Sequence, residues 1–231
     1  ASRGIGLGCA AALAGAGAHT VMVARGGEAL AAAVDEMRAA GLSAEGHALD
    51  VTDRGAVAGL LDRVGPVDIL CNSAGLARHG PALETSEADY DAVMQVNVKA
   101  AYFLAQAVAA RMEAGGAILQ VSSQMGHVGG IDRAVYCASK HAVEGMTRAM
   151  AIEWGPRGIR VNTICPTFVR TELTAATFAD PEKRAWILSK IKLPRVAEVE
   201  DVMGAVVFLA SDAAAMVTGA SLLIDGGWTA G

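Results

Sequence analysis

Basic residues, paired cysteines and long apolar runs are all scarce in this sequence. Its 19 lysines and arginines are outnumbered by 24 acidic residues, for a net charge of -5, which argues against a surface that binds nucleic acid or an anionic membrane. The 4 cysteines form no Cys-x-x-Cys pair and no cluster with histidine. We therefore expect no metal site and no disulfide framework, but reduced core thiols in a cytoplasmic protein. No apolar run approaches the roughly 18 to 20 residues that a membrane-spanning helix requires.

The sequence has instead the composition, and the alternation of strand-like and helix-like segments, of one large α/β domain. Its 231 residues are 53% hydrophobic, and short β-branched runs alternate with alanine-rich amphipathic segments. This pattern predicts a doubly wound, Rossmann-type parallel sheet with helices on both faces. We expect strands at His19–Ala24, Ala44–Leu49, Val67–Cys71, Ala117–Ser122, Arg160–Cys165 and Ser221–Ile224. We expect helices at Gly4–Gly15, Gly27–Ala40, Arg54–Val64, Tyr90–Glu113, Ala134–Gly155 and Val199–Ala210.

No repeat or flexible linker marks a second domain, so residues 1–231 are expected to form a single dinucleotide-binding catalytic domain. Within it, residues 170–194 are longer than a usual connection and end at Pro194. Long connections in compact domains are often functional. We interpret this segment as a substrate lid, with a plain pair of surface helices as the alternative.

Glycines open the first predicted helix. Gly4, Ile5 and Gly6 stand where free backbone N–H groups and the helix dipole favour an anion such as a pyrophosphate. A glycine before Ala1 would complete a Gly-x-x-x-Gly-x-Gly turn, and a glycine-rich helix start is the alternative. We therefore expect a further strand before Ala1, near the middle of the sheet, and weak cofactor binding in a chain that lacks it.

Two arginines favour NADP over NAD as the cofactor. At the end of the first visible strand, the position that usually carries a ribose-binding acid in NAD-specific folds is Ala24, followed by Arg25. Arg3 and Arg25 together can clamp a 2′-phosphate, because guanidinium groups present planar pairs of donors. Solvated surface arginines are the alternative.

Polar turns follow two further strands and are candidates for the adenine and ribose end of the same cofactor. Asp50 and Val51 are placed to meet the adenine edge, although Asp50 also suits a helix-capping turn. Asn72, Ala74 and Gly75 follow the next strand in the same way. We expect these residues to bind cofactor.

Tyr136, Lys140 and Ser123 form the candidate reacting group. Tyr136 and Lys140 are spaced i and i+4 on a predicted helix, so their polar heads share one face. A nearby ammonium group and the positive nicotinamide of the oxidised cofactor together favour the phenolate and lower the pKa of Tyr136, which makes it a usable general acid and base. Ser123, at a predicted strand end, can hold the substrate oxygen. The set indicates hydride transfer between a nicotinamide cofactor and a ketone or secondary alcohol.

With these motifs the chain resembles a classical short-chain dehydrogenase/reductase over nearly its whole length. The resemblance implies that Asn97 completes a catalytic tetrad by holding a water for proton relay, and that Lys140 also grips the nicotinamide ribose. A buried structural amide is the alternative for Asn97. It further implies cofactor contacts by Val169 and Thr171, and a homotetramer.

Residues near Tyr136 are candidates for substrate contact, namely Gln124, His127 and Arg133, with Asp132, Arg78 and His79 beside them. Such polar groups suit a polyhydroxy or acidic substrate. The stretches 41–44 with 50–53, and 178–182 with 185–186, are similar to gluconate 5-dehydrogenases and related sugar or polyol dehydrogenases.

Two other functions are open to the same fold. A 3-oxoacyl-[acyl-carrier-protein] reductase would dock an acidic carrier through a basic patch, and segments 112–116 and 171–176 lack that character. A non-catalytic dinucleotide sensor would need the fold and the cofactor site but no catalytic residues. The presence of Tyr136, Lys140, Ser123 and Asn97 together argues against a sensor.

Overall fold

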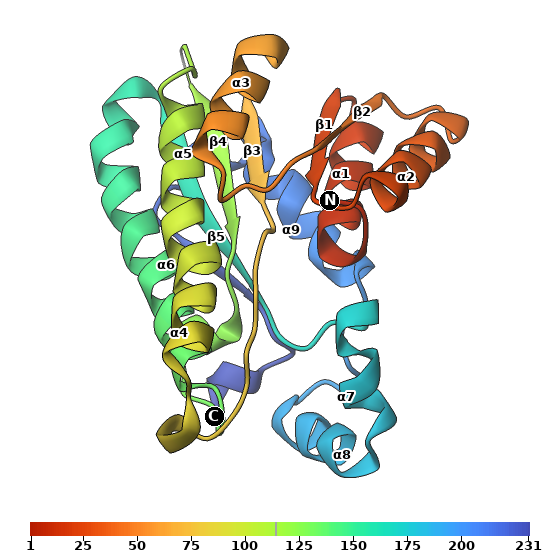
Figure 1. Cartoon of the computed structure of the whole chain (residues 1–231), viewed down its shortest axis with the longest axis vertical. Helices are drawn as coiled ribbons and strands as arrows, with labels where there is room; N and C mark the ends of the chain where they lie inside the picture. The colour runs from red at the N-terminus through yellow and green to blue at the C-terminus, as the bar shows by residue number, and fades with distance from the viewer. Residues whose placement is uncertain (114) are drawn as a thin grey trace.

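A computed structural model describes residues 1–113 and 115–231 of the chain (Figure 1). Ala114, part of the segment 112–116 discussed above, lies outside the described residues. The six predicted strands are present and every pairing is parallel, which confirms the doubly wound α/β prediction. They are β1 (Thr20–Ala24), β2 (Ala44–Ala48), β3 (Ile69–Asn72), β4 (Gly116–Val121), β5 (Ile159–Pro166) and β6 (Ser221–Ile224).

The strands form two sheets rather than one. β1 pairs with β2, and the other four are ordered β3-β4-β5-β6. The amino group of Ala1 donates a 2.5 Å hydrogen bond to the Val23 carbonyl of β1, and its charge acts on Cys71 of β3. Ala1 thus lies beside strands of both sheets. The strand expected before Ala1 stays a prediction.

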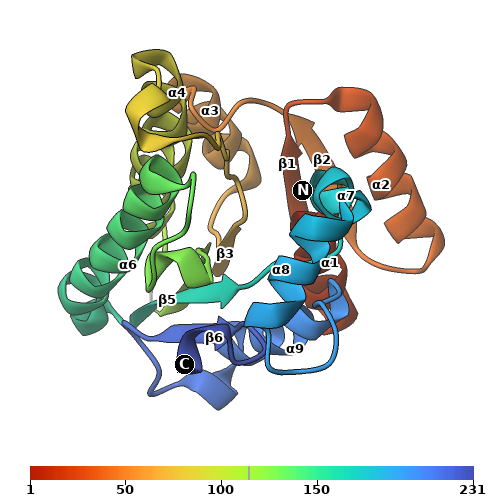
Figure 2. The ribbon, with the colours of Figure 1, turned by 90° about the horizontal axis from the view of Figure 1, so that it is seen from below.

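Helices cover both faces of the larger sheet because its strands alternate their apolar side chains. In β4, Ile118 packs with residues of α3 (Arg54–Val64), α5 (Ala101–Ala109) and α6 (Ala134–Trp154). The next residue, Leu119, packs with α1 (Gly4–Gly15) and α9 (Glu200–Ala210) on the opposite face. Figure 2 shows these two groups on opposite sides of the sheet. The smaller sheet packs on α2 (Gly27–Ala39).

The helix predicted at Tyr90–Glu113 is shorter and interrupted. It consists of α4 (Glu87–Met94), a π-helical segment (Gln95–Ala100) and α5. It begins early because the Ser86 side chain caps it by accepting from the Asp89 N–H. It ends early because the Arg157 guanidinium donates to the carbonyls of Ala109 and Met112, at 2.8 Å each.

Residues 170–194 form α7 (Ala175–Ala179) and α8 (Pro181–Lys190), at the lower end of Figure 1. Asp180 caps α8 by accepting from two backbone N–H groups. Trp186 of α8 packs edge-on against Trp228, with ring centroids 5.3 Å apart, and against Phe168 at 6.4 Å. The segment is therefore anchored to the end of β5 and to the C-terminal turn. None of the described helices is long and apolar enough to cross a membrane.

Candidate active site

The carboxyl ends of the parallel strands bring the predicted site residues to one edge of the sheet. Asn72 ends β3, Ser123 follows β4, and Thr167 follows β5. In open α/β sheets this edge is where ligands bind. Helix α6 packs across it, and it carries Tyr136 and Lys140 on the face that meets the strand ends.

Ser123, Tyr136 and Lys140 lie together in the structure. The Ser123 hydroxyl lies close enough to Tyr136 to lower its pKa, donates to Gln124 Oε1 at 2.7 Å and accepts from the Met125 N–H at 3.1 Å. Lys140 Nζ is 5.7 Å from the centre of the Tyr136 ring. The i, i+4 spacing has thus placed the ammonium next to the phenol.

Burial dominates the electrostatics of this group. Burial raises the pKa of Tyr136, and the nearby Ser123 hydroxyl opposes that rise only in part. Burial also lowers the pKa of Lys140 to about 8. In the protein without cofactor, loss of water therefore disfavours the charged form of both side chains, and the lowering of the Tyr136 pKa by the ammonium together with the oxidised nicotinamide stays a prediction.

Asn97 is buried within the π-helical segment. Its Oδ1 accepts from the Leu76 N–H at 2.7 Å, and its Nδ2 donates to the Leu76 carbonyl at 2.9 Å and to Ser139 Oγ at 3.0 Å. The side chain thus ties the loop after β3 to α6. Single π-helical turns inside α-helices are frequent at functional sites. These bonds match the structural-amide alternative, while the water-relay role stays a prediction.

The start of α1 fits a bound phosphate group. Its N-terminus has no side-chain cap, so first-turn N–H groups are free to meet an anion. Gly4 has a φ of +55°, and a Cβ there would lie 3.4 Å from Thr171 Cγ2. The structure therefore brings Thr171 beside the opening glycines, with Ile5 and Gly6 in the same turn. Arg3 is exposed and pairs with Glu172 at 3.2 Å.

The remaining cofactor candidates lie along the strand ends. Asn72 Nδ2 donates to Gln120 Oε1 at 2.8 Å, and its Oδ1 accepts from the Ala74 N–H at 3.2 Å. A Cβ on Gly75 would lie 3.7 Å from Asn97 Oδ1 and 3.9 Å from Lys140 Nζ. This loop therefore runs directly beside the reacting group.

Asp50 and its neighbours form a second turn. Its carboxylate accepts from the Thr52 N–H and hydroxyl, at 2.9 Å each. These bonds, with a smaller effect of the Arg25 charge, lower the pKa of Asp50. Arg25 is exposed and Val51 half-buried. Val169 is buried beside Thr174, whose hydroxyl donates to the Val169 carbonyl at 2.7 Å.

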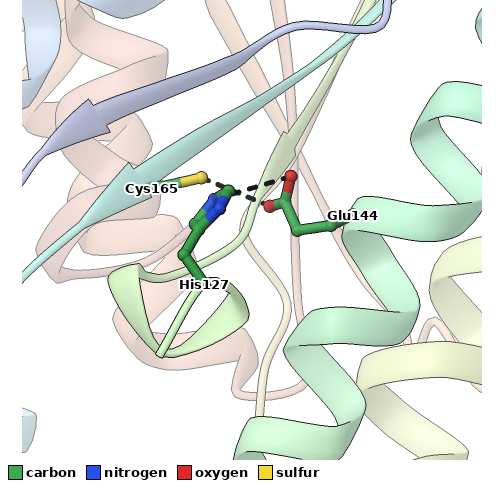
Figure 3. Close-up of side chains that lie close together, drawn as sticks. All are labelled: His127, Glu144 and Cys165. Carbon is green, nitrogen blue, oxygen red and sulfur yellow. Dashed lines mark hydrogen bonds and ion pairs between the residues drawn. The ribbon is translucent and has the colours of Figure 1, made fainter. Parts of the chain in front are cut away.

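The substrate candidates divide between two places. Gln124 is buried, and its Nε2 donates to Thr167 Oγ1 at 3.3 Å. The Arg133 guanidinium lies 5.4 Å from the centre of the Phe168 ring. Both therefore border the Ser123 and Tyr136 side of the site. The His127 ring instead points at Glu144, with 3.7 Å between Nε2 and Oε2 (Figure 3).

Glu144 is a buried carboxylate that the sequence reading missed. It follows Lys140 by one helical turn and accepts hydrogen bonds from Thr163 Oγ1 at 2.9 Å, Cys165 Sγ at 3.2 Å and Ser221 Oγ. His127, Glu144 and Cys165 include ligand types that metals favour (Figure 3). However, burial raises the pKa of Cys165 to about 12. The protonated thiol is a hydrogen-bond donor here, so the group ties α6 to β5 and β6.

Known proteins resemble the chain over nearly its entire length. A family model described as enoyl-(acyl carrier protein) reductase matches residues 1–229. D-threitol dehydrogenase of Mycolicibacterium smegmatis is 44% identical, covering 99% of this chain and 90% of that protein. Gluconate 5-dehydrogenase of Gluconobacter oxydans is 40% identical, covering 99% and 92%. A crystal structure of a Burkholderia cenocepacia gluconate 5-dehydrogenase in complex with NADP and tartrate has a TM-score of 0.95 and 35% identity, covering 100% and 92%.

The fold and the site define an oxidoreductase that binds a nicotinamide dinucleotide. The chain belongs to the short-chain dehydrogenase/reductase family, as the sequence predicted. It is an NAD(P)-dependent enzyme acting on CH–OH groups.

Proposed function

We propose that this chain interconverts a secondary alcohol and a ketone on a sugar, sugar acid or polyol, with Ser123, Tyr136, Lys140 and Asn97 as its catalytic set. The observation that carries the proposal is the position of the Lys140 ammonium, 5.7 Å from the centre of the Tyr136 ring and hydrogen-bonded to the end of the strand that leads to Ser123. The named relatives act on threitol and gluconate, and this supports the substrate class.

The chain's own residues supply binding and proton transfer. The nicotinamide ring, when bound, accepts or supplies the hydride. Ser123 Oγ holds the substrate oxygen, and Tyr136 Oη takes the proton in oxidation and returns it in reduction. The charge of Lys140 favours the phenolate form of Tyr136. Asn97 holds the loop after β3 against α6 through its bonds to Leu76 and Ser139.

The cofactor is held along the strand ends, and we propose NADP as the preferred form. The absence of an acid at Ala24, followed by Arg25, supports this preference, as does the NADP-bound relative. The proposed cofactor contacts are Arg3, Gly4, Ile5, Gly6, Arg25, Asp50, Val51, Asn72, Ala74, Gly75, Tyr136, Lys140, Val169 and Thr171.

We also propose that residues 170–194 act as a substrate lid within a single domain, and that the protein is a cytoplasmic homotetramer without a nucleic-acid partner. Anchoring of α8 through Trp186 and Trp228 supports a defined lid position. Large apolar side chains exposed on helices support self-association: Tyr102 and Ile152 are 42% and 79% exposed.

Turnover by the full-length protein tests the function. NADPH and NADH absorbance is followed across polyols, sugar acids, ketoses and small diketones. Tyr136→Phe should lower kcat by roughly 10²- to 10⁴-fold, the usual contribution of general acid–base catalysis. The matched control, Tyr90→Phe on the exposed side of α4, should leave kcat unchanged. Turnover of acyl-carrier-protein thioesters alone would favour the carrier-protein reductase, and cofactor binding without any turnover would favour a sensor.

A further inference from the structure

We infer that Arg133 forms a cationic subsite beside Tyr136, next to the imidazole of His79, and that this subsite binds the carboxylate of an acidic substrate. The enzyme therefore acts on sugar acids in preference to neutral polyols. This inference rests on the proposed function and specifies its substrate class.

Arg133 is a half-buried cation without an anionic partner. Its guanidinium lies over the Phe168 ring at 5.4 Å, and Nη1 donates to the Ile131 carbonyl at 3.3 Å. Within residues 1–113 and 115–231, no carboxylate oxygen lies within 4.0 Å of it. Burial lowers the pKa of Arg133. An arginine that has lost water without gaining an anion gains most from a ligand that supplies one.

Arg133 and Tyr136 are spaced i and i+3, so they are neighbours on the first turn of α6. A carboxylate held by Arg133 therefore lies close to the carbon whose oxygen meets Tyr136. The guanidinium is held in place by Phe168, which follows the end of β5 and packs against Trp228 at 5.7 Å between ring centroids. The donor fork thus has a fixed direction, as planar recognition of a carboxylate requires.

His79 also lies beside the Tyr136 ring. The two rings meet edge to face, with centroids 5.7 Å apart, and His79 is exposed to ligand. Partial burial and the positive charge of Arg133 lower the pKa of His79. The negative charge of Asp132 opposes this effect only in part, so the imidazole is mainly neutral near pH 7 and Arg133 alone supplies the positive charge, while His79 can donate a hydrogen bond to the carboxylate.

A backbone hydrogen bond joins the two segments that carry His79 and Arg133. The Gly80 N–H donates to the Asp132 carbonyl at 3.0 Å, joining the loop after β3 to the turn before α6. Asp132 itself has a φ of +59°, a conformation that costs energy in a non-glycine residue and is typical of ligand-binding turns. Its own side chain is exposed. The neighbouring Arg78 pairs with Asp89 at 3.5 Å and is excluded from the subsite.

Arg133→Gln and the matched control Arg148→Gln, on the exposed part of α6, test the subsite in the full-length protein. The kcat/KM is measured with D-gluconate and with D-glucitol, a neutral polyol of the same chain length. We expect the wild type to prefer gluconate, and Arg133→Gln to lower kcat/KM for gluconate by roughly 10- to 100-fold, as for loss of a charge-assisted pair. The kcat/KM for glucitol should change less than about threefold, and Arg148→Gln should change the kcat/KM of neither substrate.

Equal losses on both substrates, or a wild type that turns over only neutral polyols, would overturn the subsite and leave the proposed function standing. A wild type that reduces no sugar-like carbonyl and oxidises no sugar-like alcohol would overturn the proposed function itself. Should Arg133→Gln fail to fold, Arg133→Lys keeps the charge but loses the planar fork. It should then raise KM for gluconate alone, and an unchanged KM would count against the subsite.

Discussion

Lys140 Nζ donates a 2.8 Å hydrogen bond to the carbonyl oxygen of Val121, the last residue of β4. Ser123 follows Val121 by two residues, so this bond fixes α6 against the turn that carries the hydroxyl. The lysine is buried. A buried ammonium group lowers the stability of the folded protein, but this position holds it beside Tyr136.

Lys140→Met should stabilise the cofactor-free protein while removing its activity. The pKa of Lys140 falls from 10.5 to about 8 on burial, which corresponds to roughly 3 kcal/mol against the charged form at pH 7. Methionine removes this cost but also the bond to Val121, so we expect a gain of about 1–2 kcal/mol in the free energy of unfolding. Urea unfolding at pH 7 measures it, and kcat should fall at least about 10²-fold.

The pH dependence supplies the control for Lys140→Met. Between about pH 8 and 10.5 the unfolded state binds more protons at this site than the folded state, so the wild type gains stability as pH rises. The advantage of the variant should therefore shrink across that window. A constant difference between the two proteins would show that the buried charge is not its cause.

The sequence predicted the elements well wherever local signals agree. The range of α3 was correct because Asp53 caps its first turn by accepting from the Ala56 N–H, and α1 begins at its glycine as expected. The interruption of the long helix at Gln95–Ala100 leaves no trace in apolar periodicity, because it depends on bonds from Asn97 to a distant loop.

The reacting residues could be identified from spacing, but their environment could not. Burial of Tyr136 depends on packing between segments far apart in the chain. Glu144 shares a face with Lys140 at i and i+4, and this spacing was the one available signal. Its donors Thr163 and Ser221 lie on other strands, so no local pattern revealed the buried carboxylate.

Asn97→Ala should destabilise the protein more than loss of a single contact would. It leaves the Leu76 N–H and carbonyl and Ser139 Oγ without the partner they have now, and we expect a loss of about 2–4 kcal/mol in the free energy of unfolding. Ser139→Ala keeps both bonds to Leu76 and should lose about 1 kcal/mol. If the two variants lose equal free energy of unfolding in urea, the bonds from Asn97 to Leu76 do not contribute as argued. If Asn97→Ala lowers kcat with unchanged stability, the result favours the role of Asn97 in a water-mediated proton relay.

Arg25→Ala should weaken NADPH binding and leave NADH binding nearly unchanged. Loss of a charge-assisted contact with a 2′-phosphate corresponds to roughly 1.5–3 kcal/mol, or about 10- to 100-fold in Kd. Fluorescence titration with each cofactor measures the difference. Arg148→Ala, on the exposed part of α6, is the matched control and should alter neither Kd. If Arg25→Ala weakens the binding of NADPH and NADH equally, Arg25 does not act through the 2′-phosphate.

Glu144→Gln should destabilise the protein at neutral pH and remove part of its acid sensitivity. Burial raises the pKa of Glu144, but the hydroxyl and thiol groups around it, including the hydrogen bonds from Ser221, Cys165 and Thr163, together outweigh burial and lower it below 4.5. A carboxylate with a lowered pKa contributes stability that is present above about pH 4.5 and is lost as pH falls through the folded-state pKa. The amide is a poorer acceptor, so we expect a loss of about 2–4 kcal/mol at pH 7.

The difference between the wild type and Glu144→Gln should narrow as the pH falls below about 4.5, because the wild-type carboxyl then becomes neutral. Urea midpoints between pH 3.5 and 7 measure this, with Glu153→Gln on the exposed face of the same helix as the control. Glu144→Gln should also lower kcat, because Glu144 holds the turn of α6 that carries Lys140 against β5 and β6. A difference in stability that persists unchanged to pH 3.5 would mean that packing, not the carboxylate's charge, holds this cluster together.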